Sequence, residues 1–400
     1  MRSFLRSWLL ATLAGVVAGL AAVLVVALLD ATQWLVAGES ASAQEPATVR
    51  QALVVGAAGS VAAFAWVGLR HWQRRRNGPL AEAADALLQT VSVGIGAPVG
   101  REQAPRILAR LLTRGLLARL RVPESAVTVF AGASMGAAFG AVYNTPLAGV
   151  AFAVERVLRG RRLSEVLIAG WATAIAVPIG WLAVPRSPAF AVAPSVAWPD
   201  LAWLIVVVPL AFVLGTLVRW VWSRAARVNL GDLAEAAGGL LAFWLMAAAA
   251  IVLPQILGNG KAVVAAGLAG ELGLWEAVLL TVVKFAAVAL FFAVGIRGGQ
   301  IMPAVAVGMG AGTVLALVVE PLVGAQHAST VGFMLGIAVL AVSQRAPVFA
   351  LCFGVELVPF SPALAAALLV TVLLVGIGLR AGPTPWKRRW PAAGERPSGG

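Results

Sequence analysis

The chain has 400 residues, of which 60% are hydrophobic and only 12% are charged, and its mean hydropathy is +0.92. Soluble domains carry about 25% charged residues, so this composition excludes a water-soluble protein. The net charge of +13 would suggest nucleic-acid binding in a soluble chain. Here the arginines cluster between apolar segments, which is the positive-inside signature of membrane proteins. We therefore expect an all-α polytopic membrane protein that sits in a lipid bilayer and has no nucleic-acid partner.

The first predicted element is a membrane span at residues 8–29. Its apolar run is too long for the apolar region of a signal peptide, and a poor cleavage site follows it, so we expect the span to be retained. About 20 apolar residues cross a bilayer core. Further apolar stretches follow at 51–69, 163–184, 201–222, 240–257, 274–294, 304–319, 331–342 and 362–379.

The charges between these spans predict how the chain is oriented. The loop at 37–50 is acidic or neutral and is expected to face outward, whereas Arg2 and Arg6 mark a cytosolic N-terminus. The basic stretch WKRRW at 386–390 places the C-terminus in the cytosol as well. We expect a multi-pass protein of a cell membrane, the bacterial inner membrane being favoured. Residues 381–400, rich in proline and glycine, are predicted to be a loose cytosolic tail.

Few residues have the chemistry of an enzyme or a metal centre. The single cysteine, Cys352, excludes a disulfide framework. The two histidines, His71 and His327, lie far apart in the sequence, which argues against a metal site. No motif pairs a nucleophile with a base. We therefore expect no enzymatic activity, no metal and no cofactor.

Two stretches, 127–156 and 329–357, share one pattern. Each has a Gly/Ala-rich helix, a polar break, a proline and a second apolar helix that ends in glutamate. The interval from proline to glutamate is the same in both copies, which place these residues at Pro146 and Glu155, and at Pro347 and Glu356. Alanine-rich helices align easily by chance, which is the alternative explanation.

Each copy also has an upstream partner. GREQAP ends at Pro105 and GGQIMP ends at Pro303, each about 40 residues before the proline of its copy. The chain is therefore predicted to consist of two transmembrane repeats, 1–190 and 191–380. Paired segments interrupted by glycine and proline are typical of inverted-topology repeats whose broken helices meet at mid-membrane.

The breaks have a physical purpose. The start of a helix leaves about four backbone N–H groups unpaired, which is costly in lipid. When they point into a shared cavity, the same groups supply partial positive charge that binds an anion. Such a site has no formal cation, so it binds an anion weakly enough to release it, as conduction requires.

Four motifs resemble those of the voltage-gated chloride channel (CLC) family of channels and proton-coupled antiporters. GREQAP resembles the family's G-R/K-E-G-P signature, and GGQIMPAVAVG resembles its G-G-x-F-x-P motif. GAAFGAVYNTPLAGVAFAVE and QRAPVFALCFGVEL are similar to its two proline-containing stretches. The likeness runs in the family's order from about residue 94 to residue 379.

The resemblance implies a fold, an assembly and a site. It implies two antiparallel repeats and a homodimer with one pathway for chloride or other small anions in each subunit. It assigns Glu102 as the gate, whose carboxylate occupies an anion site when ionised and swings away when protonated. The anion-binding positions that it implies are Gly100, Arg101, Gln103, Gly299, Gln300 and Ile301.

Physical reasoning supports this role for Glu102. A carboxylate near mid-bilayer costs about 2.5–3.5 kcal/mol on insertion scales, and either protonation or backbone N–H donors lower that cost. It therefore competes with an anion for the same donors. The alternative is an ion pair of Glu102 with Arg101 or Arg106 and no role in transport. Lys284, inside an apolar helix, is interpreted as a packing or field-setting residue rather than a ligand.

Several family features have no match. The serine loop GSGIP is missing before Glu102, and Asn77 or the backbone near Gly78 is a weak substitute. The only tyrosine, Tyr143, lies in AVYNTP, so the family's pore tyrosine near the C-terminus has no counterpart except the neighbourhood of Trp386. GREQAP also has one extra residue before its proline, which leaves its register open.

The most consequential departure concerns the inner proton route. Proton-coupled members carry a second glutamate after PLAGxxFxxE, and alignment from Pro146 puts Glu155 at the first position and Arg156 at the second. A fixed cation does not relay protons, so passive channel-type chloride conduction is predicted. Glu155 is either a replacement relay or a structural carboxylate paired with Arg156 or Arg159. A chloride/proton antiporter and a fluoride-selective relative remain alternatives.

Overall fold

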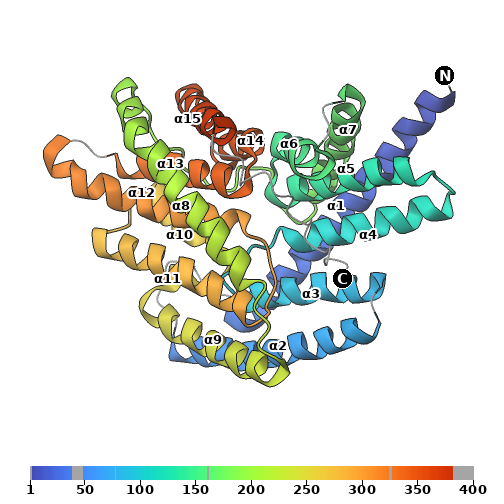
Figure 1. The fold of residues 1–400 in the computed structure, drawn as a ribbon, viewed down its shortest axis with the longest axis horizontal. Coiled ribbons are helices and arrows are strands. Elements are labelled where there is room, and N and C mark those ends of the chain that lie inside the picture. Colours follow the sequence, from blue (N-terminus) through green and yellow to red (C-terminus); the bar gives the residue numbers. More distant parts are fainter. Residues whose placement is uncertain (1, 38–47, 77, 160–161, 324–326, 382–400) are drawn as a thin grey trace.

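The computed structural model describes residues 2–37, 48–76, 78–159, 162–323 and 327–381. These residues are almost entirely helical, as Figure 1 shows. Within this part of the chain, nine helices are long and apolar enough to cross a membrane. The prediction of an all-α polytopic membrane protein is confirmed. The predicted tail beyond residue 381, with Trp386, and residue Asn77 lie outside the described residues.

The first part of the chain forms seven α-helices. They are α1 (Arg2–Ala37), α2 (Val49–Arg75), α3 (Pro79–Ile95), α4 (Gln103–Arg119), α5 (Glu124–Tyr143), α6 (Pro146–Phe152), which continues into the wider turn η1 (Ala153–Leu158), and α7 (Leu163–Gly180).

The second part begins with a short 3₁₀ turn, η2 (Trp198–Trp203), and contains a second one, η3 (Pro254–Ile256). Its α-helices are α8 (Leu204–Ala225), α9 (Asp232–Val252), α10 (Lys261–Ala269), α11 (Leu274–Ala293), α12 (Ile301–Val323), α13 (Ala328–Gln344), α14 (Pro347–Leu357) and α15 (Pro362–Ala381).

The order of long and short helices is the same in both parts, with one exception. Between α9 and α11 lie residues 253–273, which form η3 and α10, whereas only residues 76–78 connect α2 to α3. This is the region where the sequence lacks the serine loop. Among the described residues of the first part, therefore, no helix corresponds to α10. The boundary of the two repeats at residue 190 stays a prediction.

The polar breaks before α6 and α14 have the same local geometry. Asn144 and Arg345, each two residues before the proline that opens the next helix, have φ values of 55° and 52°. The left-handed conformation ends the preceding helix. Proline is suited to the first position of the new helix because that N–H has no intrahelical partner. The same break is thus built twice from different residues.

Glycines bring α12 and α13 into backbone contact. A Cβ on Gly308 would lie 2.6 Å from the Cα of Gly336, and one on Gly312 would lie 2.7 Å from the Cα of Gly332. Small residues permit such close approach between membrane helices. The motif GMGAGT at 308–313 is therefore a packing motif.

Replacing Gly336 by leucine is expected to lower the apparent midpoint of thermal unfolding in detergent. The added side chain meets the carbonyl oxygen of Val305 at 2.9 Å, and overpacking of this kind costs about 1–3 kcal/mol. Gly170→Leu is the matched control, because a Cβ there meets no atom within 4 Å. Equal midpoints for the two variants would contradict tight packing of α12 on α13.

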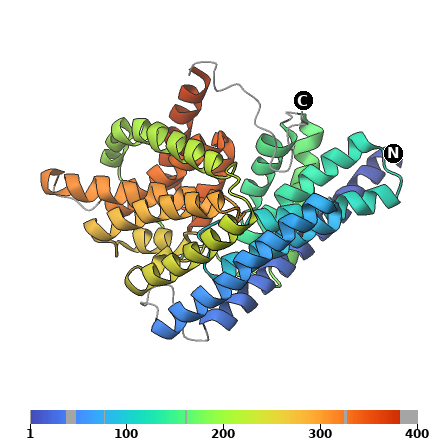
Figure 2. The ribbon, with the colours of Figure 1, turned by 60° about the horizontal axis from the view of Figure 1, so that its bottom comes forward.

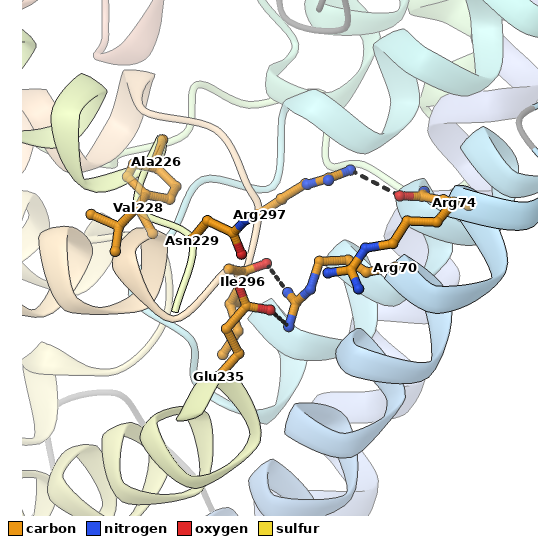
Figure 3. A pocket seen from close by; sticks show the side chains of 11 residues that line it. Arg70, Arg74, Ala226, Val228, Asn229, Glu235, Ile296 and Arg297 are labelled. Carbon is orange, nitrogen blue, oxygen red and sulfur yellow. Dashed lines mark hydrogen bonds and ion pairs between the residues drawn. The ribbon is translucent and has the colours of Figure 1, made fainter. Parts of the chain in front are cut away.

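The two parts of the chain also meet where α2 lies beside α9, which both views show (Figures 1 and 2). Here the Nη2 atom of Arg70 lies 2.5 Å from a carboxylate oxygen of Glu235, and Nη1 donates a hydrogen bond of 2.7 Å to the carbonyl oxygen of Gly295. Figure 3 shows this pair at the edge of a cavity of about 210 Å³ that Arg74 and Arg297 also line. One arginine thus joins α2 to α9 and to the segment before α12.

Candidate anion site

The two glycine-containing breaks lie directly against each other. The N–H of Gly100 donates to the carbonyl oxygen of Gly299, and the N–H of Gly299 donates to that of Gly100, both at 2.7 Å. This antiparallel bridge joins the segments that lead into α4 and α12. The starts of two helices from distant parts of the sequence therefore meet at one point.

Each of these helices has a proline at its third position, Pro105 in α4 and Pro303 in α12. The N–H that proline lacks is one that the first turn leaves unpaired anyway. Residues 101–102 form a turn directly before α4 begins. The proline therefore occupies the same position in the helix that follows each break.

Glu102 lies between the two helix starts and is fully buried, with 0% of its surface exposed. Its Oε1 atom accepts a hydrogen bond of 2.8 Å from the N–H of Ile301, the first residue of α12. Its Oε2 atom accepts one of 3.2 Å from the hydroxyl of Tyr143. The carboxylate therefore takes an unpaired donor of the second helix, where the helix dipole favours negative charge.

The neighbouring arginines do not form an ion pair with this carboxylate in the described part of the chain. The Nε–H of Arg106 donates to the main-chain carbonyl oxygen of Glu102 at 2.7 Å, and its guanidinium lies 4.7 Å from the ring centre of Phe152. The guanidinium of Arg101 lies 5.1 Å from the ring centre of Tyr143. The arrangement differs from the ion pair considered as the alternative for Glu102.

The structure brings Glu102 together with four of the six expected anion-binding positions. Gly100 and Gly299 form the bridge, and Ile301 bonds to Glu102. Arg101 lies in the same turn and stacks on Tyr143 instead of reaching the carboxylate. Two further expected positions flank the helix starts: Gln103 opens α4 and Gln300 precedes α12. Roles in anion binding stay predictions for all of them.

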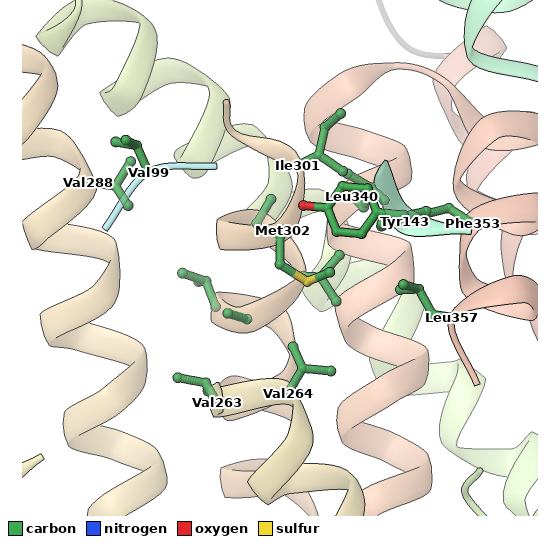
Figure 4. Close-up of a cluster of buried hydrophobic side chains, with 14 of the residues drawn as sticks. Val99, Tyr143, Val263, Val264, Val288, Ile301, Met302, Leu340, Phe353 and Leu357 are labelled. Carbon is green, nitrogen blue, oxygen red and sulfur yellow. The ribbon is translucent and has the colours of Figure 1, made fainter. Parts of the chain in front are cut away.

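Tyr143 and Asn259 belong to this site, and sequence reasoning missed both. Tyr143 ends α5 directly before a break, and its hydroxyl oxygen accepts a hydrogen bond of 3.4 Å from Nδ2 of Asn259. In Figure 4 its side chain lies between Ile301 and Phe353. The available signal was that the only tyrosine of the chain falls beside the polar break of a repeated motif.

Lys284 supports the segment that contains Asn259. It is fully buried, and Nζ donates hydrogen bonds of 2.7 and 2.6 Å to the carbonyl oxygens of Ile256 and Gly258. The N–H of Gly258 in turn donates to the carbonyl oxygen of Gly96 at 3.0 Å. These contacts agree with the interpretation of Lys284 as a packing residue.

Glu155 and Glu356 make reciprocal contacts between the two parts of the chain. The carboxylate of Glu155 accepts from the N–H groups of Val348 and Phe349 at the start of α14, at 3.4 and 2.8 Å. The carboxylate of Glu356 accepts from those of Leu147 and Ala148 at the start of α6, both at 2.8 Å. Glu155 lies in η1, directly after α6, and Glu356 lies in the last turn of α14. Each glutamate caps the start of the other short helix, so α6 and α14 run antiparallel.

Arg156 has a structural partner as well. Its Nη1 donates to the main-chain carbonyl oxygen of Gln344 at 2.8 Å, at the C-terminus of α13. A cation at this end of a helix is favourable because the last carbonyl groups have no intrahelical partners. Among the described residues no ion pair joins Glu155 to Arg156 or Arg159. The carboxylate of Glu155 therefore has backbone partners in place of the expected arginine.

Glu356→Gln and Glu155→Gln are each expected to lower the apparent unfolding midpoint in detergent. A charged cap on a helix start contributes about 0.5–2 kcal/mol, and the neutral amide retains only part of it. Glu320→Gln is a suitable control, since Glu320 lies in the last turn of α12 and not at a helix start. Midpoints unchanged from the parent in both cap variants would refute the capping role.

The model of the family described as voltage gated chloride channel matches residues 69–376. The fold is similar to that of a slow cyanobacterial Cl⁻/H⁺ antiporter, with a TM-score of 0.76, 15% identity and 96% of each chain covered. It is also similar to a CLC-type fluoride/proton antiporter, with a TM-score of 0.69, 17% identity and coverage of 94% of this chain and 96% of that one.

A eukaryotic CLC transporter gives a TM-score of 0.73 at 15% identity, with 96% of this chain and 73% of that chain covered. A search of curated protein sequences finds no match. Identities this low show the fold alone, and the family follows from the sequence model. Because that model spans well over half of the chain and agrees with the fold, the chain belongs to the voltage gated chloride channel (CLC) family of membrane anion transporters and channels.

Proposed function

We propose that this chain conducts chloride passively across the membrane and that Glu102 is the gate. The observation that carries the proposal is the hydrogen bond between the Glu102 carboxylate and the N–H of Ile301. That N–H belongs to a helix start, where a small anion is stabilised by the same donors and the same dipole. A carboxylate held there excludes an anion from the donor.

Protonation opens the gate in this mechanism. An ionised Glu102 keeps the Ile301 N–H occupied, whereas a neutral carboxyl group is a weaker acceptor and loses its electrostatic attraction to the helix start. An anion then takes the donor. Among the described residues no cationic side chain forms an ion pair with the Glu102 carboxylate, so an anion that replaces it binds weakly enough to allow release on the other side.

The contacts of Glu155 and Arg156 support passive conduction over coupled exchange. Glu155 is engaged as the cap of α14, and Arg156, at the position of the family's second glutamate, is bonded to Gln344. A guanidinium stays protonated and does not relay protons. The alternative, a chloride/proton antiporter, is supported by the described activity of the similar cyanobacterial protein.

A fluoride-selective transporter is the other alternative. Residues 76–78 connect α2 directly to α3, so among the described residues no helix follows α2 in the region where the family has its serine loop. One of the similar solved structures is that of a CLC-type fluoride/proton antiporter. In the CLC family, the serine hydroxyl of that loop donates to the anion, and the loop usually accompanies chloride selectivity. Its absence leaves the backbone of the two helix starts as the main donors to the anion.

Flux from proteoliposomes tests these proposals together. Vesicles are loaded with chloride, nitrate or fluoride, an outward gradient is imposed with valinomycin and potassium, and anion efflux and internal pH are followed. We expect chloride efflux without accompanying proton movement. Stoichiometric proton uptake would establish the antiporter, efflux of fluoride alone would establish the fluoride-selective alternative, and absence of all flux would reject transport.

Two further expectations, one from the family resemblance and one from the charge distribution, stay proposals. We infer a homodimer with a separate pathway in each subunit, and both termini in the cytosol of the cell whose membrane holds the protein. The exposed apolar residues of α7 and α15, such as Leu167 and Leu373, are compatible with lipid as well as with a second copy. Cross-linking in native membranes and accessibility of an N-terminal tag would test them.

A further inference from the structure

We propose that Tyr143, oriented by Asn259, is a positioning residue that holds the Glu102 carboxylate in the anion site and so sets the pH at which the gate opens. The inference rests on the proposed gating role of Glu102. It assigns a function to a residue from the end of α5 and to one from the segment before α10, neither of which belongs to the helix starts themselves.

The ring of Tyr143 is held rigidly. Only 2% of its surface is exposed, and its centre lies 5.3 Å from the ring centres of both Phe139 and Phe353. The guanidinium of Arg101 lies 5.1 Å from the same centre. These contacts fix the hydroxyl at 3.2 Å from Oε2 of Glu102, and hydrogen bonds to charged groups are the stronger ones when the surroundings are dry.

The direction of the hydrogen bond follows from Asn259. The main-chain N–H of Lys261 donates to Oδ1 of Asn259 at 3.2 Å, which identifies the atom facing Tyr143 as the Nδ2 donor. Since Nδ2 donates to the hydroxyl oxygen at 3.4 Å, the hydroxyl hydrogen of Tyr143 is free to point at Glu102. The phenol therefore acts as a donor to the carboxylate.

The segment that contains Asn259 is itself held in place by Lys284 and by a backbone hydrogen bond of Gly258. Lys284 bonds to the carbonyl oxygens of Ile256 and Gly258, and Gly258 bonds to Gly96 in the segment that leads to Glu102. Lys284, Asn259 and Tyr143 thus form a continuous chain of contacts ending on the carboxylate. It spans both parts of the chain, so the gate is held by more than the N–H of Ile301.

Removal of the Tyr143 hydroxyl is expected to shift the pH midpoint of chloride flux in one defined direction. A phenolic donor stabilises an ionised carboxylate more than a neutral carboxyl group. Removing the hydroxyl therefore makes protonation and departure of Glu102 easier. In chloride flux measured against pH, Tyr143→Phe is expected to move the midpoint upward by about one pH unit, the size of one hydrogen bond to a charged group.

The experiment measures chloride efflux from proteoliposomes over pH 4–9 for the full chain, Tyr143→Phe, Asn259→Ala and the control Asn229→Ala. We expect an upward shift for the first variant, a smaller one in the same direction for the second, and none for the control, whose exposed side chain lies at the cavity of Figure 3. Lower flux at every pH with an unmoved midpoint would show a merely structural tyrosine.

The Glu102→Gln background separates this inference from the proposed function. There Tyr143→Phe should have no further effect, because the charge that the phenol stabilises is gone. Suppose that Glu102→Gln abolishes the pH dependence of chloride flux, whereas Tyr143→Phe has the same flux profile against pH as the parent. The positioning role of Tyr143 is then wrong, and the gating role of Glu102 is retained. If Glu102→Gln leaves the pH dependence unchanged, the gating proposal itself fails. A loss of flux by Tyr143→Phe within the Glu102→Gln background would instead mark the hydroxyl as an anion ligand.

Discussion

Glu102→Gln is expected to raise chloride flux at neutral pH and to make it nearly independent of pH. The amide has the shape of the protonated acid and no charge with which to compete for the N–H of Ile301. A hydrogen bond to a charged group contributes about 1.5–3 kcal/mol, which corresponds to about a 10- to 150-fold change in that competition. Efflux from proteoliposomes at pH 5, 7 and 9 measures it.

Glu102→Ala tests the same step without a hydrogen-bonding side chain. It leaves the N–H of Ile301 open to the anion, so it should conduct at least as well as Glu102→Gln at neutral pH. Glu356→Gln is the matched control, since it neutralises a glutamate at a different helix start. A parent-like pH profile in both Glu102 variants, with flux intact, would mean that this carboxylate is not the gate.

The fold could be predicted from sequence because its main determinants are local or repetitive. Apolar length gave the spans, and glycine and proline marked the breaks before α4, α6, α12 and α14. Helix limits were less accurate: α9 begins at Asp232, ahead of the apolar run predicted from residue 240, because polar and charged residues of its first turns fit helix geometry as well as apolar ones do.

The location of the Glu102 carboxylate was also predictable, since a buried acid needs donors and the paired helix starts offer them. The bond to Ile301 joins residues that are distant in the sequence, and the internal duplication was the signal that connected them. What the motif did not reveal is that the carboxylate caps the opposite helix and leaves its own, α4, without a side-chain cap.

The rest of the site depends on tertiary contacts with no sequence pattern of their own. Asn259 reaches Tyr143 only because the segment after α9 folds back on Lys284. The partners of Glu155 are backbone N–H groups, and every residue type except proline offers one, so the sequence gives no hint of which will be used. Charged neighbours such as Arg156 are easier to propose from sequence as partners of Glu155, but they are not the groups that its carboxylate contacts.

Removing Arg70 is expected to produce the largest loss of stability. In Arg70→Met, the Glu235 carboxylate, whose residue is 4% exposed, loses its ion-pair partner, and the carbonyl oxygen of Gly295 loses its donor. Breaking a buried ion pair from one side costs about 3–5 kcal/mol because the remaining charge stays buried. We expect the apparent unfolding midpoint in detergent to fall by about 5 °C or more.

The double variant Arg70→Met/Glu235→Leu should recover much of that loss, because it removes the unpaired charge together with its partner. Arg74→Gln is the matched control on the same two helices: its ion pair with Asp232 spans 3.0 Å, but the side chains are 47% and 38% exposed, so a change of about 0–1 kcal/mol is expected. If Arg70→Met unfolds no earlier than Arg74→Gln, then the contact between α2 and α9 is held by apolar packing, and the buried pair contributes nothing to joining the two parts of the chain.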